Sequence, residues 1–212
     1  NSVMINLKIA IQKSGRLNED SLTLLKECGI SINNGKDQLM AQASNFRLDV
    51  LYLRNSDIPQ YVRDGVADIA IIGDNTEKEK KTGIRHVLDL GFSRCRLSIA
   101  VPKNVDFQDI SYLQGKKIAT SYPNSLKDFL TENDIEAEIH EISGSVEIAP
   151  NIGLTDAICD LVSSGSTLFK NGLKEVYKIF YSQAILVANS GLCGEKQELL
   201  AQLVFRIKAV LA

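Results

Sequence analysis

The sequence is poor in the residues that mark several common kinds of functional site. Its 212 residues include no tryptophan, two histidines and four cysteines. The cysteines are far apart in the sequence, so neither zinc-ligand spacing nor a disulfide framework is indicated. We expect four reduced, mostly buried thiols. With so few histidines, a histidine-centred triad or a histidine-rich metal site is not expected either.

An excess of charge of one sign and long apolar runs are also lacking. The 24 Lys and Arg residues are balanced by 26 Asp and Glu, a net charge of −2 that is not typical of a non-specific nucleic-acid binder. No apolar run approaches the ~20 residues that span a bilayer. The first residues lack the profile of a signal peptide. These features predict a globular cytoplasmic protein that binds neither nucleic acid nor membrane.

What is present is an alternation of β-branched runs and amphipathic stretches. The expected strands are residues 7–12, 48–53, 68–72, 94–101, 117–119, 137–141, 157–162 and 176–188. The expected helices are residues 17–28, 58–64, 125–133, 145–154 and 195–211. This order predicts an α/β fold with parallel sheets covered on both faces. Two such series predict two lobes with a cleft between them, residues 1–96 plus 184–212 and residues 97–183.

The most informative loop follows the expected strand 157–162. After Asp160 it contains Ser163, Ser164, Gly165, Ser166 and Thr167. Such a loop offers several backbone N–H groups and hydroxyls to a phosphate, and the following helix adds a favourable dipole. The acid would meanwhile hold ribose hydroxyls. An ordinary capped connection, with Ser and Thr serving turn chemistry, explains the same residues.

Two further loops carry cations at the ends of expected strands, where open α/β sheets bind ligands. Lys13, Gly15 and Arg16 follow the first strand and suit phosphate oxygens, although a solvated turn accounts for them equally well. Arg54 leaves the end of a buried strand, which would direct it into a cleft. Asp57 is explained more simply as a helix cap.

Two other positions have both a functional and a structural interpretation. Ser121 and Tyr122 would contact a phosphate and stack on a base, or else begin a helix with an aromatic residue on the surface. Glu147 would accept hydrogen bonds from sugar hydroxyls or stabilise developing positive charge. Its alternative is stabilisation of the first turn of a helix through the dipole.

Together these segments resemble one family, ATP phosphoribosyltransferase, the first enzyme of histidine biosynthesis. The matching stretches are IQKSGRL (11–17), RNSDIP (54–59), DGVADIAIIG (64–73), CRL (95–97), IATSYP (118–123), GSVEIAP (144–150) and GLTDAICDLVSSGSTLFKNGL (153–173). They follow the family's order along nearly the whole chain. The last stretch is the most specific, and the set carries more weight than any single member.

The resemblance implies two α/β lobes like those of type II periplasmic binding proteins, with mixed sheets and an inter-lobe cleft. It implies that adenine N1 of ATP attacks the anomeric carbon of phosphoribosyl pyrophosphate (PRPP), releasing pyrophosphate, with Mg²⁺ accompanying the phosphates. A homo-oligomer built from dimers is also implied. The terminal helix and the sheet edge near residues 36–43 are candidate contacts between copies.

Matching residue by residue, the resemblance assigns roles to sixteen positions. Asp160 and residues 163–167 correspond to the loop that holds the ribose phosphate of PRPP, and Glu147 to a sugar-side motif. The residues that correspond to polyphosphate and nucleotide contacts are Lys13, Gly15, Arg16, Arg54, Ser121 and Tyr122. Less certain roles near the cleft fall to Asp57, Gly73 and Cys95. Of these, we expect Arg16, Arg54, Glu147 and Asp160 to act in catalysis.

The family has a long form with a C-terminal histidine-sensing domain and a short form that uses a separate regulatory subunit. The QKSGRL and CRLS segments resemble the long form, so we expect a long-form catalytic core without its regulatory domain, and a natural short form is the alternative.

Two other functions stay open. One is a non-catalytic solute-binding or sensor protein of the same fold, and the other is a different PRPP-using transferase.

Overall fold

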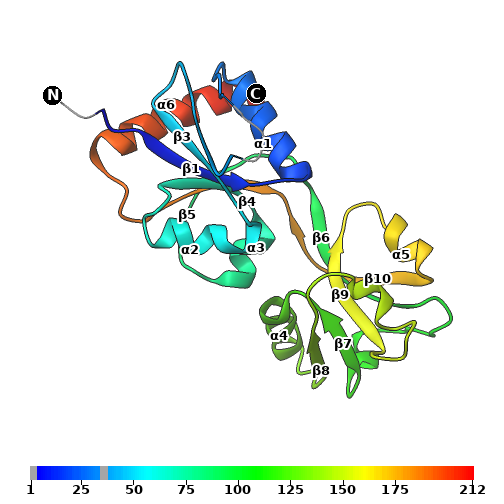
Figure 1. Cartoon of the computed structure of the whole chain (residues 1–212). Coiled ribbons are helices and arrows are strands. Elements are labelled where there is room, and N and C mark those ends of the chain that lie inside the picture. Colours follow the sequence, from blue (N-terminus) through cyan, green and yellow to red (C-terminus); the bar gives the residue numbers. More distant parts are fainter. Residues whose placement is uncertain (1–3, 34–37) are drawn as a thin grey trace. The chain divides into compact units, whose positions relative to one another are not determined.

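The computed structural model describes residues 4–33 and 38–212 of the chain. These fall into two compact units, Asn1–Ser93 with Gln183–Ala212 (unit 1) and Arg94–Ser182 (unit 2), and the chain passes between the units twice (Figure 1). Among the described residues, no helix has the length and apolar character needed to cross a bilayer.

Unit 1 is built on a mixed six-stranded sheet. Its strand order is β2-β3-β1-β4-β11-β5, with bounds β1 (Leu7–Gln12), β2 (Met40–Gln42), β3 (Leu48–Leu53), β4 (Ile69–Gly73), β5 (Arg85–Asp89) and β11 (Ala184–Ala188). β1 lies between β3 and β4 and is parallel to both. β11 is antiparallel to β4 and β5, its neighbours on either side.

Alternating residues of these strands bury both faces of the sheet. On one face, Ile9 and Ile11 pack with α1 (Arg16–Glu27) and α6 (Gly194–Leu211). On the other face, Ala10 and Ile72 pack with Ile58 and Val62 of α2 (Ile58–Arg63). The short η1 (Asn55–Asp57) precedes α2, and α3 (Asp74–Lys80) follows β4 directly. The sheet is therefore covered by helices on both sides (Figure 1).

Unit 2 contains a mixed five-stranded sheet. Its order is β10-β6-β9-β7-β8, with bounds β6 (Cys95–Pro102), β7 (Lys117–Thr120), β8 (Glu138–Glu141), β9 (Ala157–Val162) and β10 (Leu173–Ser182). One face packs on α4 (Pro123–Glu132) and η2 (Ile110–Leu113). The opposite face packs on η3 (Val146–Ile148) and α5 (Ser166–Lys170) through Val146 and Leu168.

Three expectations about the elements were wrong. Both sheets are mixed, as the family resemblance implies, and not parallel, as the alternation of strands and helices predicts. The expected strand 176–188 is two strands, β10 and β11, that belong to different sheets because the chain leaves unit 2 between them. The expected helix 145–154 is only the single turn η3 followed by turns, since Pro150 has no N–H to continue the helical hydrogen bonds and Gly153 has a positive φ. Of the edge expected near residues 36–43, residues 36 and 37 lie outside the described residues, and β2 is an edge strand.

Candidate functional site

The loop after β9 encloses a cavity of about 230 Å³ in unit 2. Its lining combines the loop with carboxylates from two other places, Glu147 on η3 and Asp160 inside β9. All five predicted loop residues, Ser163, Ser164, Gly165, Ser166 and Thr167, line it. The structure therefore brings together seven of the sixteen predicted site residues.

The loop conformation depends on Gly165. This residue has φ +85° and precedes the first residue of α5, and an added Cβ would meet no atom within 4 Å. The backbone conformation rather than lack of space therefore favours glycine here. The Ser164 hydroxyl lies 3.1 Å from that of Ser166 and accepts from the Ser166 N–H at 3.4 Å. Turn chemistry thus accounts for part of the serine content, as the alternative interpretation holds.

The cavity also receives backbone donors from the helix that follows. The first turn of a helix leaves N–H groups without partners inside the helix. In α5 the residues that bear them, Ser166, Thr167 and Leu168, line the cavity, and of these the Ser166 N–H already donates to the Ser164 hydroxyl. Because α5 has only five residues, we attribute anion affinity to these N–H groups and to the hydroxyls, and not to a helix dipole.

Asp160 is the titratable group whose environment is most unusual. Burial raises the pKa of Asp160 to about 6, the Leu161 N–H at 2.9 Å opposes this rise, and the nearby negative charge of Glu147 adds to it. Two carboxylates that repel each other gain stability from any positive charge placed between them. The cavity can therefore bind phosphate oxygens at the loop and stabilise a cation beside Asp160 and Glu147.

This raised pKa predicts a pH dependence of stability. The Asp160 pKa moves from the ordinary 3.8 to about 6, so the folded state binds the proton more tightly than the unfolded chain. The contribution of this group is therefore fully present below about pH 4 and is lost as pH rises to about 6. We expect urea unfolding to show this loss in the unaltered protein and not in Asp160→Asn. Equal pH slopes in the two proteins would contradict it.

In unit 1, the predicted cationic loops meet at one edge of the sheet. Gln12 is in register with Leu53 at the carboxyl ends of the parallel strands β1 and β3, and the Lys13 N–H donates to the Leu53 carbonyl at 2.9 Å. Lys13 is exposed. The Arg16 side chain is 78% exposed and lies 3.7 Å from Asp20, so a surface pair of this kind constrains it little.

Gly15 has φ +85° and ends the turn that leads into α1, which explains glycine at this position. Arg54 is exposed and follows β3 directly. The sheet order places β1 between β3 and β4, where the direction of the chain connections reverses. Ligands of open α/β sheets bind at such a reversal.

The other predicted residues at this end of the unit 1 sheet are Asp57 and Gly73, and their environment indicates a structural role. Asp57 occupies the predicted N-cap position of α2, but its side chain makes no capping hydrogen bond. Gly73 ends β4, and a Cβ there would lie 2.4 Å from the Asn75 Oδ1 atom. Asn55, which sequence reasoning missed, donates from Nδ2 to the Thr76 hydroxyl at 3.0 Å and so joins η1 to α3. Its place in the RNSDIP stretch was the available signal.

The remaining predicted residues lie in unit 2. Ser121 donates its hydroxyl proton to the Ile142 carbonyl at 2.5 Å. Tyr122 is the N-cap residue with which α4 begins, as its structural alternative proposes, but it is half-buried against the core of the α4 face and does not lie on the surface. Cys95 is partly buried, and burial raises the pKa of its thiol, which keeps it protonated near neutral pH. Cys95 is therefore not suited to act as a nucleophile.

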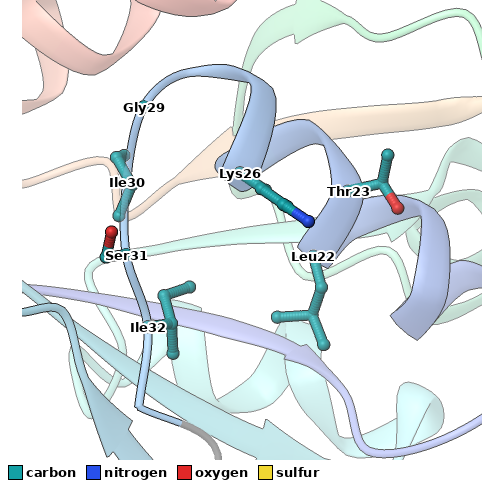
Figure 2. Close-up of a pocket in the computed structure, with 7 residues that line it drawn as sticks. All are labelled: Leu22, Thr23, Lys26, Gly29, Ile30, Ser31 and Ile32. Carbon is teal, nitrogen blue, oxygen red and sulfur yellow. The ribbon is translucent and has the colours of Figure 1, made fainter.

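A larger cavity of about 460 Å³ lies in unit 1, and no feature of the sequence indicated it. Figure 2 shows Leu22, Thr23 and Lys26 of α1 on one side and the segment 29–32 on the other. Among the described residues that line it, Lys26 is the one cation. This cavity lacks the donor-rich turn and the paired carboxylates of the unit 2 cavity, so its chemistry does not suit a sugar phosphate.

Comparison with known proteins agrees with this chemistry. The family model described as HisG, ATP phosphoribosyltransferase, matches residues 54–209. The chain belongs to the ATP phosphoribosyltransferase family. A relative of that name from Cytophaga hutchinsonii is 59% identical over 204 residues, covering 96% of this chain and 71% of the relative. Another from Phocaeicola vulgatus is 52% identical over 206 residues, covering 97% and 73%.

Solved structures give the same family and a wider fold relationship. The ATP phosphoribosyltransferase (HisG:HisZ) complex from Thermotoga maritima matches with TM-score 0.83 and 29% identity, covering 97% of this chain and 98% of that chain. The alkanesulfonate-binding protein SsuA from Xanthomonas axonopodis matches with TM-score 0.64 at 14% identity, covering 99% and 74%. The second match shows that the fold is that of periplasmic binding proteins.

Membership in the ATP phosphoribosyltransferase family establishes the reaction. The protein is a pentosyltransferase that condenses ATP and PRPP to N1-(5-phosphoribosyl)-ATP and pyrophosphate. This is the first step of histidine biosynthesis. The expectations for fold class, family and reaction are confirmed.

Proposed function

We propose that the unit 2 cavity binds the ribose 5-phosphate part of PRPP, and that the cationic edge of unit 1 binds polyphosphate and nucleotide groups. The single observation that carries this assignment is the cavity itself, which joins a donor-rich turn to two carboxylates. A sugar phosphate needs both, since its phosphate requires N–H and hydroxyl donors and its ribose hydroxyls require acceptors.

The reaction makes modest demands on the side chains. The lone pair of adenine N1 forms the new bond to the anomeric carbon, and the bond from that carbon to pyrophosphate breaks with its electron pair leaving on oxygen. Adenine N1 is already a nucleophile, so no activated Ser or Cys is needed. We assign to Asp160 and Glu147 the stabilisation of positive charge that develops on the sugar. Arg16, Arg54 and Lys13 align the phosphates and offset their charge.

Mg²⁺ fits this arrangement as a companion of the substrate phosphates. Asp160 and Glu147 offer carboxylate oxygens beside the phosphate-binding turn, and Mg²⁺ is commonly held by one or two carboxylates together with substrate phosphates. Among the described residues, no group of three or more His, Cys, Asp or Glu side chains forms a metal cage. When bound, the ion offsets negative charge on the leaving pyrophosphate.

The location and the assembly of the enzyme are inferred from its substrates and its relatives. We propose that it acts in the cytoplasm, where ATP and PRPP are made and used, as a homo-oligomer built from dimers. If the protein is a natural short form, it would bind a separate regulatory subunit, an alternative that the solved structure of a HisG:HisZ complex with the same fold supports. Native mass measurement of the protein, alone and with a candidate subunit, tests both statements.

The activity is tested by mixing ATP, PRPP and Mg²⁺ with the protein and following phosphoribosyl-ATP and pyrophosphate together. We expect both products in equal amounts. Pyrophosphate with a different phosphoribosylated product would indicate another PRPP-using transferase. Binding of unaltered ATP with no product would indicate a binding protein of this fold instead.

We expect Arg16→Ala and Arg54→Ala each to lower kcat/KM at least about tenfold, the effect of losing one charged hydrogen bond to a phosphate. Both side chains are exposed, so the thermal midpoint of unfolding should stay within a few degrees. Arg63→Ala, an exposed cation of α2 in the same unit, is the matched control. Near-normal kinetics in both variants would contradict their assignment.

A further inference from the structure

The CRL stretch contains Arg96, a residue that has no assigned role in binding or catalysis. Arg96 lies on β6, whose residues alternate between the two faces of the sheet. In the antiparallel pair with β9, Arg96 is opposite Val162 and Ser98 is opposite Asp160. Directly paired residues share a face. Arg96 and Ser98 therefore lie on the face that carries Asp160 and the cavity.

The Arg96 guanidinium is held by two bonds to one carboxylate. Its Nε donates to Glu175 Oε2 at 2.7 Å and its Nη2 to Glu175 Oε1 at 2.8 Å. The Ser98 hydroxyl donates to the same Oε2 atom at 2.6 Å. The Arg96 and Glu175 side chains are 20% and 19% exposed, and the arginine lowers the pKa of Glu175. A two-point pair shielded in this way fixes the plane of the guanidinium.

The remaining side of the guanidinium faces the phosphate-binding turn. Arg96 Nη1 donates to the Ser163 carbonyl at 3.1 Å, and Ser163 is the first residue after β9 and part of the cavity lining. Because Glu175 neutralises the arginine, Arg96 is not a free cation for substrate phosphate. A lysine has one compact ammonium and cannot hold both Glu175 oxygens and the carbonyl in this planar arrangement.

We infer that Arg96 is a positioning residue for PRPP binding, which fixes the Ser163 peptide so that the following N–H groups point into the cavity, with Glu175 and Ser98 holding Arg96 in turn. This inference rests on the proposed role of the loop as the PRPP site. It assigns no contact between Arg96 and the substrate.

The test compares Arg96→Lys with the unaltered protein. We expect KM for PRPP to rise at least about tenfold, as for the loss of a hydrogen bond to a charged group, with KM for ATP unchanged within twofold. Hydrogen exchange of peptides that cover 163–168 should become faster, while exchange in unit 1 should not change. Arg206→Lys is the matched control, because Arg206 also donates to a backbone carbonyl, that of Cys28 at 3.3 Å, but in unit 1.

Two milder variants keep the test decisive if Arg96→Lys does not fold. Glu175→Gln keeps an acceptor without its charge, and Ser98→Ala removes one donor; both should raise KM for PRPP in the same direction. Unchanged KM for PRPP and unchanged loop exchange in a folded variant of an active enzyme would overturn the inference. An inactive unaltered protein would instead contradict the assigned activity, and the exchange measurement would still decide whether Arg96 orders the loop.

Discussion

Replacing Asp160 with asparagine is expected to lower kcat by about 100-fold to 1,000-fold, the range found when one preorganised electrostatic group is removed from an active site. The reason is that the carboxylate to which we assign stabilisation of the reacting sugar loses its charge while the shape of the side chain is kept. The pKa of Asp160 is about 6, so the measurement belongs near pH 8, where the unaltered side chain is ionised. Product formation at saturating ATP and PRPP gives kcat directly.

The kcat values of Glu147→Gln and of the double variant Asp160→Asn/Glu147→Gln test whether the two carboxylates act together. Because Glu147 contributes to the raised pKa of Asp160, the two groups interact, and the loss in the double variant should be smaller than the product of the single losses. Asp106→Asn removes an exposed carboxylate elsewhere in unit 2 and should leave kcat unchanged. A folded Asp160→Asn enzyme with kcat within threefold of normal would contradict the electrostatic role.

Gly165→Val is expected to raise KM for PRPP on the order of 100-fold, because displacing catalytic or binding groups by about 1 Å has effects of this size. A β-branched residue does not accept φ +85°. The loop must therefore change its backbone, and the N–H groups of α5 turn away from the cavity. Steady-state kinetics with varied PRPP, and calorimetry with ribose 5-phosphate, measure the effect.

Gly172→Val separates this effect from general strain. Gly172 also has a positive φ, +70°, with no atom within 4 Å of an added Cβ, and it lies just beyond α5 outside the cavity lining. Both variants should lose comparable stability, while Gly165→Val alone should lose affinity for PRPP. Equal losses of affinity in the two variants would show that the loop conformation has no special role.

Much of the framework was predictable because local pattern and tertiary environment agree. The strands 7–12, 48–53 and 157–162 have the predicted bounds, since each is an apolar run that ends at polar or glycine-rich residues. The same reasoning predicted the loop 163–167, whose Gly and Ser content follows from its turn. The sequence also indicated Glu147 as an acceptor for sugar hydroxyls, and the structure brings it to the same cavity although it is distant from the loop in sequence.

What was missed depends on contacts between distant residues. The pattern of 176–188 does not reveal that Gln183 separates two sheets, because apolar residues continue on both sides of it. The bond from Arg96 to Ser163 joins residues far apart in the sequence. A signal for it existed, since Arg96 and Ser98 alternate with apolar Leu97 and Ile99 in an otherwise buried strand. That alternation indicates a polar face on β6 but not its partner.

The double passage of the chain between units also sets an order for folding. β11 lies between β4 and β5 and bonds to both, and α6 completes the core on one face of the same sheet. During synthesis, every residue of unit 2 emerges before these two elements do. Unit 2 can therefore close its own core while unit 1 is still an open sheet with unpaired neighbours of β11. Formation of unit 1 is then a late, non-local step, which places the greatest exposure to aggregation at the edges of β4 and β5.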